Sequence, residues 1–173
     1  MLSVEDALDR ILSQVTSLQP VQVNLTEADG LVLAEDIIAP FDVPRHSNSA
    51  MDGYAIRAGD VSSASRVNPC KLRVIGQIRA GETPESKLSP GTAMRIMTGA
   101  PIPVGSDCVI PYELTDETER LRSGIDLDFI TIFHNGQSGD HVRPAGEDVS
   151  KGSTVLVKGR ILDPPSLGMA ASL

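Results

Sequence analysis

Three short glycine-containing segments carry the side chains that are best suited to chemistry in this sequence. Each of them combines small or turn-forming residues with an aspartate or a threonine: Asn48 to Ala55, Arg95 to Pro103 and Arg143 to Gly152. A carboxylate can bind a cation or move a proton, whereas a threonine hydroxyl beside exposed backbone N–H groups can bind an anion. These segments are therefore the candidate site.

The first segment converges on Asp52-Gly53. On physical grounds alone this pair is most simply a tight turn, because aspartate tolerates the left-handed region and glycine supplies a positive φ. The second segment places Thr98 at a strand end beside Gly99, where the hydroxyl and the backbone N–H groups could meet an anion. A plain β-turn fixed by Pro101 is the alternative.

The third segment contains the adjacent acids Glu147 and Asp148 after Gly146. Such hard oxygen ligands suit Mg²⁺, which takes few carboxylates and keeps several waters, although an acidic pair on a loop is also often only solvated. The histidines and cysteines show no metal-ligand or disulfide spacing, and we treat them as structural or surface residues: His46, His134, His141, Cys70 and Cys108.

The element that precedes these segments is an amphipathic helix. Ser3 and Asp6 resemble a capping box, apolar residues then recur at helical spacing up to Val15, and Pro20 ends the pattern after about four turns. Beyond it, the sequence predicts a short strand at 21–25, one helical turn at 26–29 and a second strand at 31–37.

The middle of the chain is predicted to form an all-β unit, because glycines and prolines interrupt short β-prone runs at close intervals. The predicted strands are Tyr54–Arg57, Lys71–Ile78, Ala93–Met97, Cys108–Leu114, Phe129–Phe133 and His141–Arg143, with a hairpin-type turn at Ser123-Gly124. No helix of three or more turns is expected between residues 40 and 149.

The last part of the chain predicts a miniature strand pair at 152–160 and a helix at 167–173 that Asp163 and two prolines introduce. That helical pattern breaks off at the last residue, from which we expect a fragment of a longer protein. The whole predicts a mainly β chain with an N-terminal helix arm (1–19), a small discontinuous α+β unit (20–38 plus 150–173) and an inserted β-rich lobe (39–149).

Charge and composition exclude some classes of binding partner. The net charge is −8 and aromatic residues make up 3 %, which argues against binding to nucleic acid or to anionic membranes. Residues 41–110 nevertheless carry six acids and eight bases, so an anion would be tolerated there, and several of these bases lie near glycine- or proline-rich turns: Arg45, Arg57, Arg79 and Arg95. No stretch approaches 18 consecutive apolar residues, and we expect a cytoplasmic, soluble protein.

The order and the amino-acid sequences of the three segments resemble the N-terminal region of the molybdopterin molybdenumtransferases of the MoeA/gephyrin family. The matching strings are Asn48-Ser49-Ala50-Met51-Asp52-Gly53-Tyr54-Ala55, Arg95-Ile96-Met97-Thr98-Gly99-Ala100-Pro101 and Gly146-Glu147-Asp148. The resemblance covers essentially the whole chain. It implies insertion of molybdate into adenylylated molybdopterin, with loss of AMP and in the presence of Mg²⁺.

The resemblance also implies roles for individual residues. Asp52, Thr98 and Asp148 would be catalytic, with Asp52 and Asp148 as Mg²⁺ ligands, and the cofactor-binding positions would be Ser49, Met51 and Gly99. The family further implies a homodimer and a pterin-binding domain after this region, so we expect this chain to fold and self-associate but to be inactive alone. The alternative is a non-catalytic dimerisation or scaffolding module from the same family.

Overall fold

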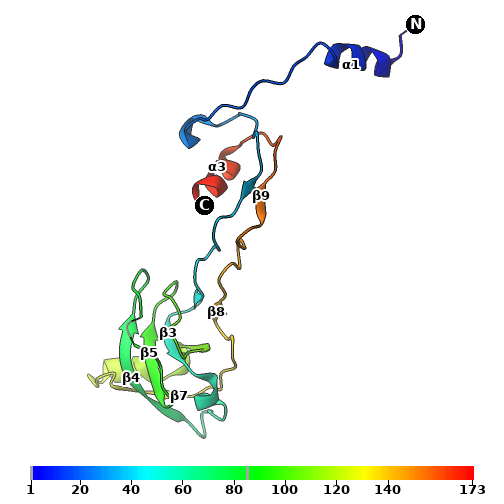
Figure 1. The fold of residues 1–173 in the computed structure, drawn as a ribbon. Coiled ribbons are helices and arrows are strands. Elements are labelled where there is room, and N and C mark those ends of the chain that lie inside the picture. The colour runs from blue at the N-terminus through cyan, green and yellow to red at the C-terminus, as the bar shows by residue number, and fades with distance from the viewer. Residues whose placement is uncertain (1, 85) are drawn as a thin grey trace. The chain divides into compact units, whose positions relative to one another are not determined.

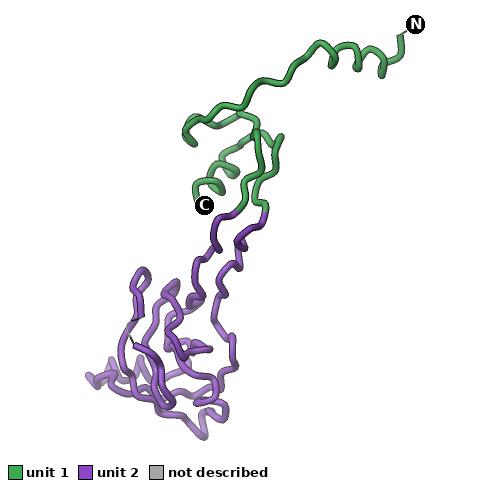
Figure 2. Tube along the Cα trace, viewed as in Figure 1, with its two compact units in different colours: residues 1–38, 154–173 green, residues 39–153 purple. Residues whose placement is uncertain are grey.

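The computed structural model describes residues 2–84 and 86–173. Contacts divide the chain into two compact units, one formed by residues 1–38 and 154–173 and the other by residues 39–153 (Figure 2). The second unit holds all three candidate segments. Each unit has a hydrophobic cluster of its own.

A five-stranded sheet forms the centre of unit 2, in the order β6-β3-β5-β4-β7 (Figure 1). The strands are β3 (Gly53–Ile56), β4 (Cys70–Ile78), β5 (Thr92–Ile96), β6 (Cys108–Pro111) and β7 (Phe129–Ile132). All neighbours in the sheet are antiparallel except β4 and β5, which are parallel. The mainly β class expected from the sequence is confirmed.

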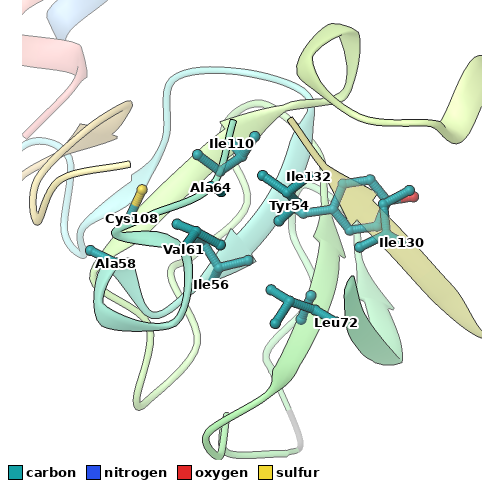
Figure 3. Packing of buried hydrophobic residues seen from close by; sticks show 11 residues of the cluster. Tyr54, Ile56, Ala58, Val61, Ala64, Leu72, Cys108, Ile110, Ile130 and Ile132 are labelled. Atoms are coloured by element: carbon teal, nitrogen blue, oxygen red, sulfur yellow. The ribbon is translucent and has the colours of Figure 1, made fainter. Parts of the chain in front are cut away.

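Strands β3 and β6 are buried on both faces of the sheet, whereas β4 alternates between buried and exposed side chains. Successive side chains of a strand point to opposite faces. Accordingly Tyr54 and Ile56 belong to one buried cluster, together with Val61 from the 3-10 turn η2 (Ala58–Val61), while Ala55 belongs to the other. Figure 3 shows the first cluster, whose labelled side chains come together from β3, η2, β4, β6, β7 and the loop after η2. This packing fixes the register of the strands that carry the candidate site.

Shorter elements complete unit 2. The two-residue strands β2 (Asn48–Ser49) and β8 (Val142–Arg143) pair antiparallel. The run expected as one strand at 108–114 ends as the 3-10 turn η3 (Tyr112–Leu114), and it leads to the six-residue helix α2 (Glu117–Arg122). The hairpin expected at Ser123-Gly124 is therefore wrong, because these residues end α2, with Gly124 at φ 67°.

Unit 1 is built from a strand pair, a 3-10 turn and a helix. Strand β1 (Ile37–Ile38) pairs antiparallel with β9 (Thr154–Leu156), and η1 (Leu25–Glu27) lies near α3 (Pro164–Ala171). The miniature hairpin expected at 152–160 is wrong, because β9 pairs with β1, a strand more than a hundred residues earlier in the chain. The predicted terminal helix is confirmed, with Asp163 as its N-cap.

The N-terminal helix α1 (Val4–Leu12) begins at the predicted Ser3 cap but is shorter than expected. None of its residues is buried, so no tertiary packing supports the turns that the apolar pattern predicted beyond Leu12. The strand expected at 21–25 is absent from the described chain, since Val21 and Val23 are exposed and pair with no neighbour. Over residues 2–84 and 86–173 no helix is long and apolar enough to span a bilayer.

Candidate functional site

The register of two strands brings Asp52 and Thr98 together. Asp52 directly precedes β3 and Thr98 follows β5 by two residues, and these strands are antiparallel with Gly53 opposite Ile96. The start of one strand therefore lies beside the end of the other. Asp52 Oδ1 accepts two hydrogen bonds from Thr98, one from the backbone N–H and one from Oγ1, both at 2.7 Å.

Gly53 is required here by close packing and not by a turn. Its φ is not among the positive values of the chain, and a Cβ atom at this position would lie 2.1 Å from the backbone oxygen of Ile110 in β6. The tight turn expected at Asp52-Gly53 is therefore wrong, because the glycine begins strand β3 and lets β6 approach. The backbone of Asp52 is also held, since its carbonyl accepts a hydrogen bond from Tyr112 N at 3.2 Å.

The Asp52 carboxylate stays charged in this setting. The backbone N–H and the hydroxyl of Thr98, with a smaller contribution from the charge of Arg95, hold the pKa of Asp52 below its usual range. Both Asp52 and Thr98 are exposed to solvent. Within the described chain Asp52 Oδ2 accepts no hydrogen bond, so one oxygen of an ionised carboxylate remains available to a ligand.

A buried ion pair supports this corner of the sheet. Arg95 in β5 binds Glu117 at the start of α2 through Nε and Nη2, with the shortest contact 2.7 Å. The Glu117 side chain is 3 % exposed and that of Arg95 is 21 % exposed. Arg95 Nη1 also reaches the Met97 sulfur at 3.3 Å, beside Thr98. This pair escaped the sequence analysis, because nothing in the sequence marks Glu117 as buried.

Of the three positions expected to bind cofactor, Ser49 has a different environment from Met51 and Gly99. Ser49 is 1 % exposed, and its hydroxyl donates to Met51 O at 2.6 Å. Its hydroxyl therefore serves to shape its own segment. Met51 and Gly99 are exposed, and Gly99, at φ 80°, is the third residue of a turn that the hydrogen bond from Ala100 N to Met97 O closes at 3.0 Å. A ligand would reach this segment at these two residues.

Asp148 lies in the same unit but in a different environment. Both of its carboxylate oxygens accept hydrogen bonds from Arg143 Nη2, at 3.0 and 3.1 Å, while Arg143 Nε binds Glu147 at 2.6 Å. Arg143 itself stands opposite Asn48 in the β2–β8 pair. In the described part of the chain no hydrogen bond or ion pair joins Asp148 to Asp52 or Thr98. The catalytic roles that the resemblance implies predict that all three residues face one surface, and this stays a prediction.

The carboxylates can be tested against the Mg²⁺ ion that the resemblance implies. Among the described residues no three His, Cys, Asp or Glu side chains cluster as a metal site. Asp52 fits a magnesium ion as a single ligand, because one oxygen is open and Mg²⁺ commonly takes one or two carboxylates. Asp148 fits less well in this arrangement, because the Arg143 guanidinium occupies both of its oxygens.

Known proteins resemble this chain over its whole length. The family model described as "MoeA N-terminal region (domain I and II)" matches residues 2–173. Molybdopterin molybdenumtransferase 2 of Mycobacterium tuberculosis is 43 % identical over 173 residues, which are 100 % of this chain and 41 % of that protein. A molybdopterin molybdenumtransferase of Synechococcus elongatus is 38 % identical over 176 residues, or 100 % of this chain and 42 % of that protein.

A solved structure gives the same result. The crystal structure of the molybdopterin biosynthesis moeA protein from Pyrococcus horikoshii OT3 superposes with a TM-score of 0.86 at 36 % identity. That match covers 98 % of this chain and 43 % of the other. The chain thus spans about two fifths of the length of the relatives that it resembles.

Proposed function

The chain belongs to the MoeA family, as its N-terminal region, and from this we propose that it supplies part of the site at which molybdate is inserted into adenylylated molybdopterin with release of AMP. The observation that carries the proposal is the contact between Asp52 and Thr98. These residues come from two motifs 46 positions apart, yet both face solvent and share a hydrogen bond.

The chemistry of the substrates fits this division of roles. Molybdate is a dianion, so a bare carboxylate would repel it, and Asp52 is better suited to a cation or to moving protons on water. A magnesium ion held at Asp52 would offset the negative charge of molybdate. Thr98 does not donate to an oxyanion in this arrangement, because its hydroxyl and its backbone N–H both donate to Asp52. Its role is to position the carboxylate of Asp52. Asp148 would join Asp52 and Thr98 at the site once its carboxylate released Arg143 and bound another partner.

We further propose a cytoplasmic homodimer. Support for self-association comes from α1, which keeps large apolar side chains exposed along one stripe, for example Val4, Leu8 and Ile11. Such an amphipathic helix is stabilised when a partner surface covers its apolar face. A scaffolding module from the same family would use this helix equally, but it would have no need for the Asp52–Thr98 contact.

A chimeric enzyme tests the proposal. Residues 1–173 would replace the matching region of the Mycobacterium tuberculosis relative, which is 43 % identical. With adenylylated molybdopterin, Mg²⁺ and molybdate, we expect AMP release at a rate within about tenfold of the parent, a margin of about 1.4 kcal/mol. A folded chimera that binds the substrate but releases no AMP would contradict the catalytic proposal and favour the scaffold.

A further inference from the structure

The two segments that meet at Asp52 and Thr98 continue side by side away from that contact. We call residues 45–52 and 98–102 the motif ribbon. Three backbone hydrogen bonds join its two sides in antiparallel order: Gly99 N to Ser49 O (2.8 Å), Ser49 N to Ala100 O (2.9 Å) and Ile102 N to Ser47 O (3.0 Å). The ribbon therefore carries the Asp52–Thr98 contact at one end and Ser47 near the other.

A pocket of about 430 Å³ opens at that other end. Its polar lining comes from Arg45, His46 and Ser47 of the ribbon and from Thr83, and the rest of its wall is mainly proline and aliphatic. All of these residues belong to unit 2, so the pocket is formed within one compact unit. The motif ribbon therefore runs from this pocket to the Asp52–Thr98 contact.

Among the described residues that line the pocket, Arg45 is the one Lys or Arg side chain, whereas the chain as a whole has a net charge of −8. Arg45 is exposed, and its guanidinium carbon lies 3.9 Å from the centre of the Phe41 ring, which holds the cation in place. Arg45 forms no ion pair with any described residue, whereas Arg95 and Arg143 are each paired with carboxylates. None of the described residues that line the pocket is acidic.

Hydroxyl donors stand beside this cation. Ser47 Oγ accepts a hydrogen bond from Ala145 N at 3.3 Å, which leaves its own O–H free to donate. In the described chain Thr83 Oγ1 takes part in no hydrogen bond, so it can also donate. A guanidinium with adjacent hydroxyl donors suits the oxygens of a phosphate group, because charge-assisted hydrogen bonds are short and strong.

We propose that this pocket binds a phosphate group, either as free inorganic phosphate or as the phosphate of a nucleotide-containing substrate. The ribbon spans at most roughly 17 Å between Ser47 and Asp52. A nucleotide joined to a second ring system can cover such a length, so one substrate could occupy both ends. The identification as a substrate subsite rests on the proposed function, whereas phosphate binding as such does not.

Titration of the amide NMR spectrum tests this inference on the chain itself. Inorganic phosphate and, separately, AMP would be added at constant ionic strength maintained with chloride. We expect saturable shifts at the backbone amides of Ser47, Ile102 and Ala145, which border the pocket. Tighter binding of AMP would identify the nucleotide as the source of the phosphate, and equal binding would identify the free oxyanion; either result supports the pocket.

Two charge variants complete the test. Arg45→Gln should weaken phosphate binding roughly five- to tenfold, because it removes an exposed charge-assisted contact. Arg66→Gln makes the same charge change at an exposed arginine outside the pocket and should leave binding unchanged. Equal affinity in the wild type and Arg45→Gln, or shifts spread over all basic residues, would overturn the inference. The readout is binding, so this result is independent of AMP release by the chimera.

Discussion

Asp52 in unit 2 and Asp163 in unit 1 accept the same pair of hydrogen bonds. Each carboxylate binds one backbone N–H and one hydroxyl, from Thr98 and from Ser166 respectively. Hydrogen bonds from these partners hold the pKa of both aspartates below the usual range. The local chemistry of the two sites is therefore nearly the same.

Their settings differ in two respects. Asp163 is the N-cap of α3 and binds a residue three positions later, which is an ordinary structural use of such a side chain. Asp52 instead joins the ends of two strands, 46 residues apart in sequence. The second oxygen of Asp163 faces Arg160 at 3.8 Å, whereas that of Asp52 has no partner among the described residues. The hydrogen-bond pattern alone therefore does not identify a functional carboxylate. The position of the carboxylate in the fold does.

The largest expected effect is on the strand that carries Asp52. Gly53→Ala should destabilise unit 2 by at least about 3 kcal/mol, because the added Cβ would lie 2.1 Å from Ile110 O and would push β6 away from β3. Urea unfolding followed by circular dichroism measures the change.

Gly168→Ala in α3 is the matched control, since a Cβ there meets nothing within 4 Å. Alanine favours a helix over glycine, so this variant should stabilise the protein by about 0.5 to 1 kcal/mol. If both variants had the same small effect, the close approach of β3 and β6 would not be what requires glycine at position 53.

The next largest effect is expected for the ion pair between Arg95 and Glu117, which lies near the Asp52–Thr98 contact. Arg95→Met leaves the carboxylate of Glu117, 3 % exposed, without a partner and should cost about 3 kcal/mol in the free energy of unfolding. The double variant Arg95→Met with Glu117→Leu should recover most of that loss, because no charge then remains buried. A double variant as unstable as the single one would show that the pair contributes by packing alone.

The middle of the chain could be predicted well from its sequence, because its strands are local apolar runs bounded by glycine and proline. The predicted strand at 71–78 corresponds to β4, and the one at 93–97 corresponds to β5 within one residue at each end. The prediction was wrong where pairing is long-range, as for β9, whose partner β1 is distant in sequence. Periodicity in a short segment cannot identify such a partner.

The candidate site was predictable to a similar degree. The motifs identified Asp52 and Thr98, but their contact depends on the antiparallel register of β3 and β5, which the sequence does not state. The sequence marks Arg143 only as a strand end and the start of its motif, and its bonds to Glu147 and Asp148 depend on the fold. A spacing of four residues from Arg143 to Glu147 was the one available signal, and it is weak outside a helix.

The smallest effect separates the two donors of Asp52. Because its pKa is depressed, the carboxylate stabilises the folded protein above the usual aspartate range near pH 4, and this contribution is lost as the pH falls through the folded pKa. Thr98→Val removes only the hydroxyl donor, so the pKa of Asp52 should rise part of the way toward its usual value. The loss of stability near neutral pH should stay below about 1 kcal/mol.

Carboxyl NMR titration measures this pKa directly. Ser166→Ala is the control, since it should raise the pKa of Asp163 and leave that of Asp52 unchanged. An Asp52 pKa that does not move in Thr98→Val would mean that the backbone N–H alone sets it.

AMP release by the chimera carrying Asp52→Asn or Asp163→Asn is the most direct test of the central claim, that Asp52 is a functional carboxylate and Asp163 a structural one. Asparagine keeps the shape of both side chains, and it also caps helices well. We expect Asp52→Asn to lower the rate at least about a hundredfold, the usual scale for losing a group that moves protons or holds a cation, and Asp163→Asn to leave it unchanged. Equal rates in the two variants would contradict the claim.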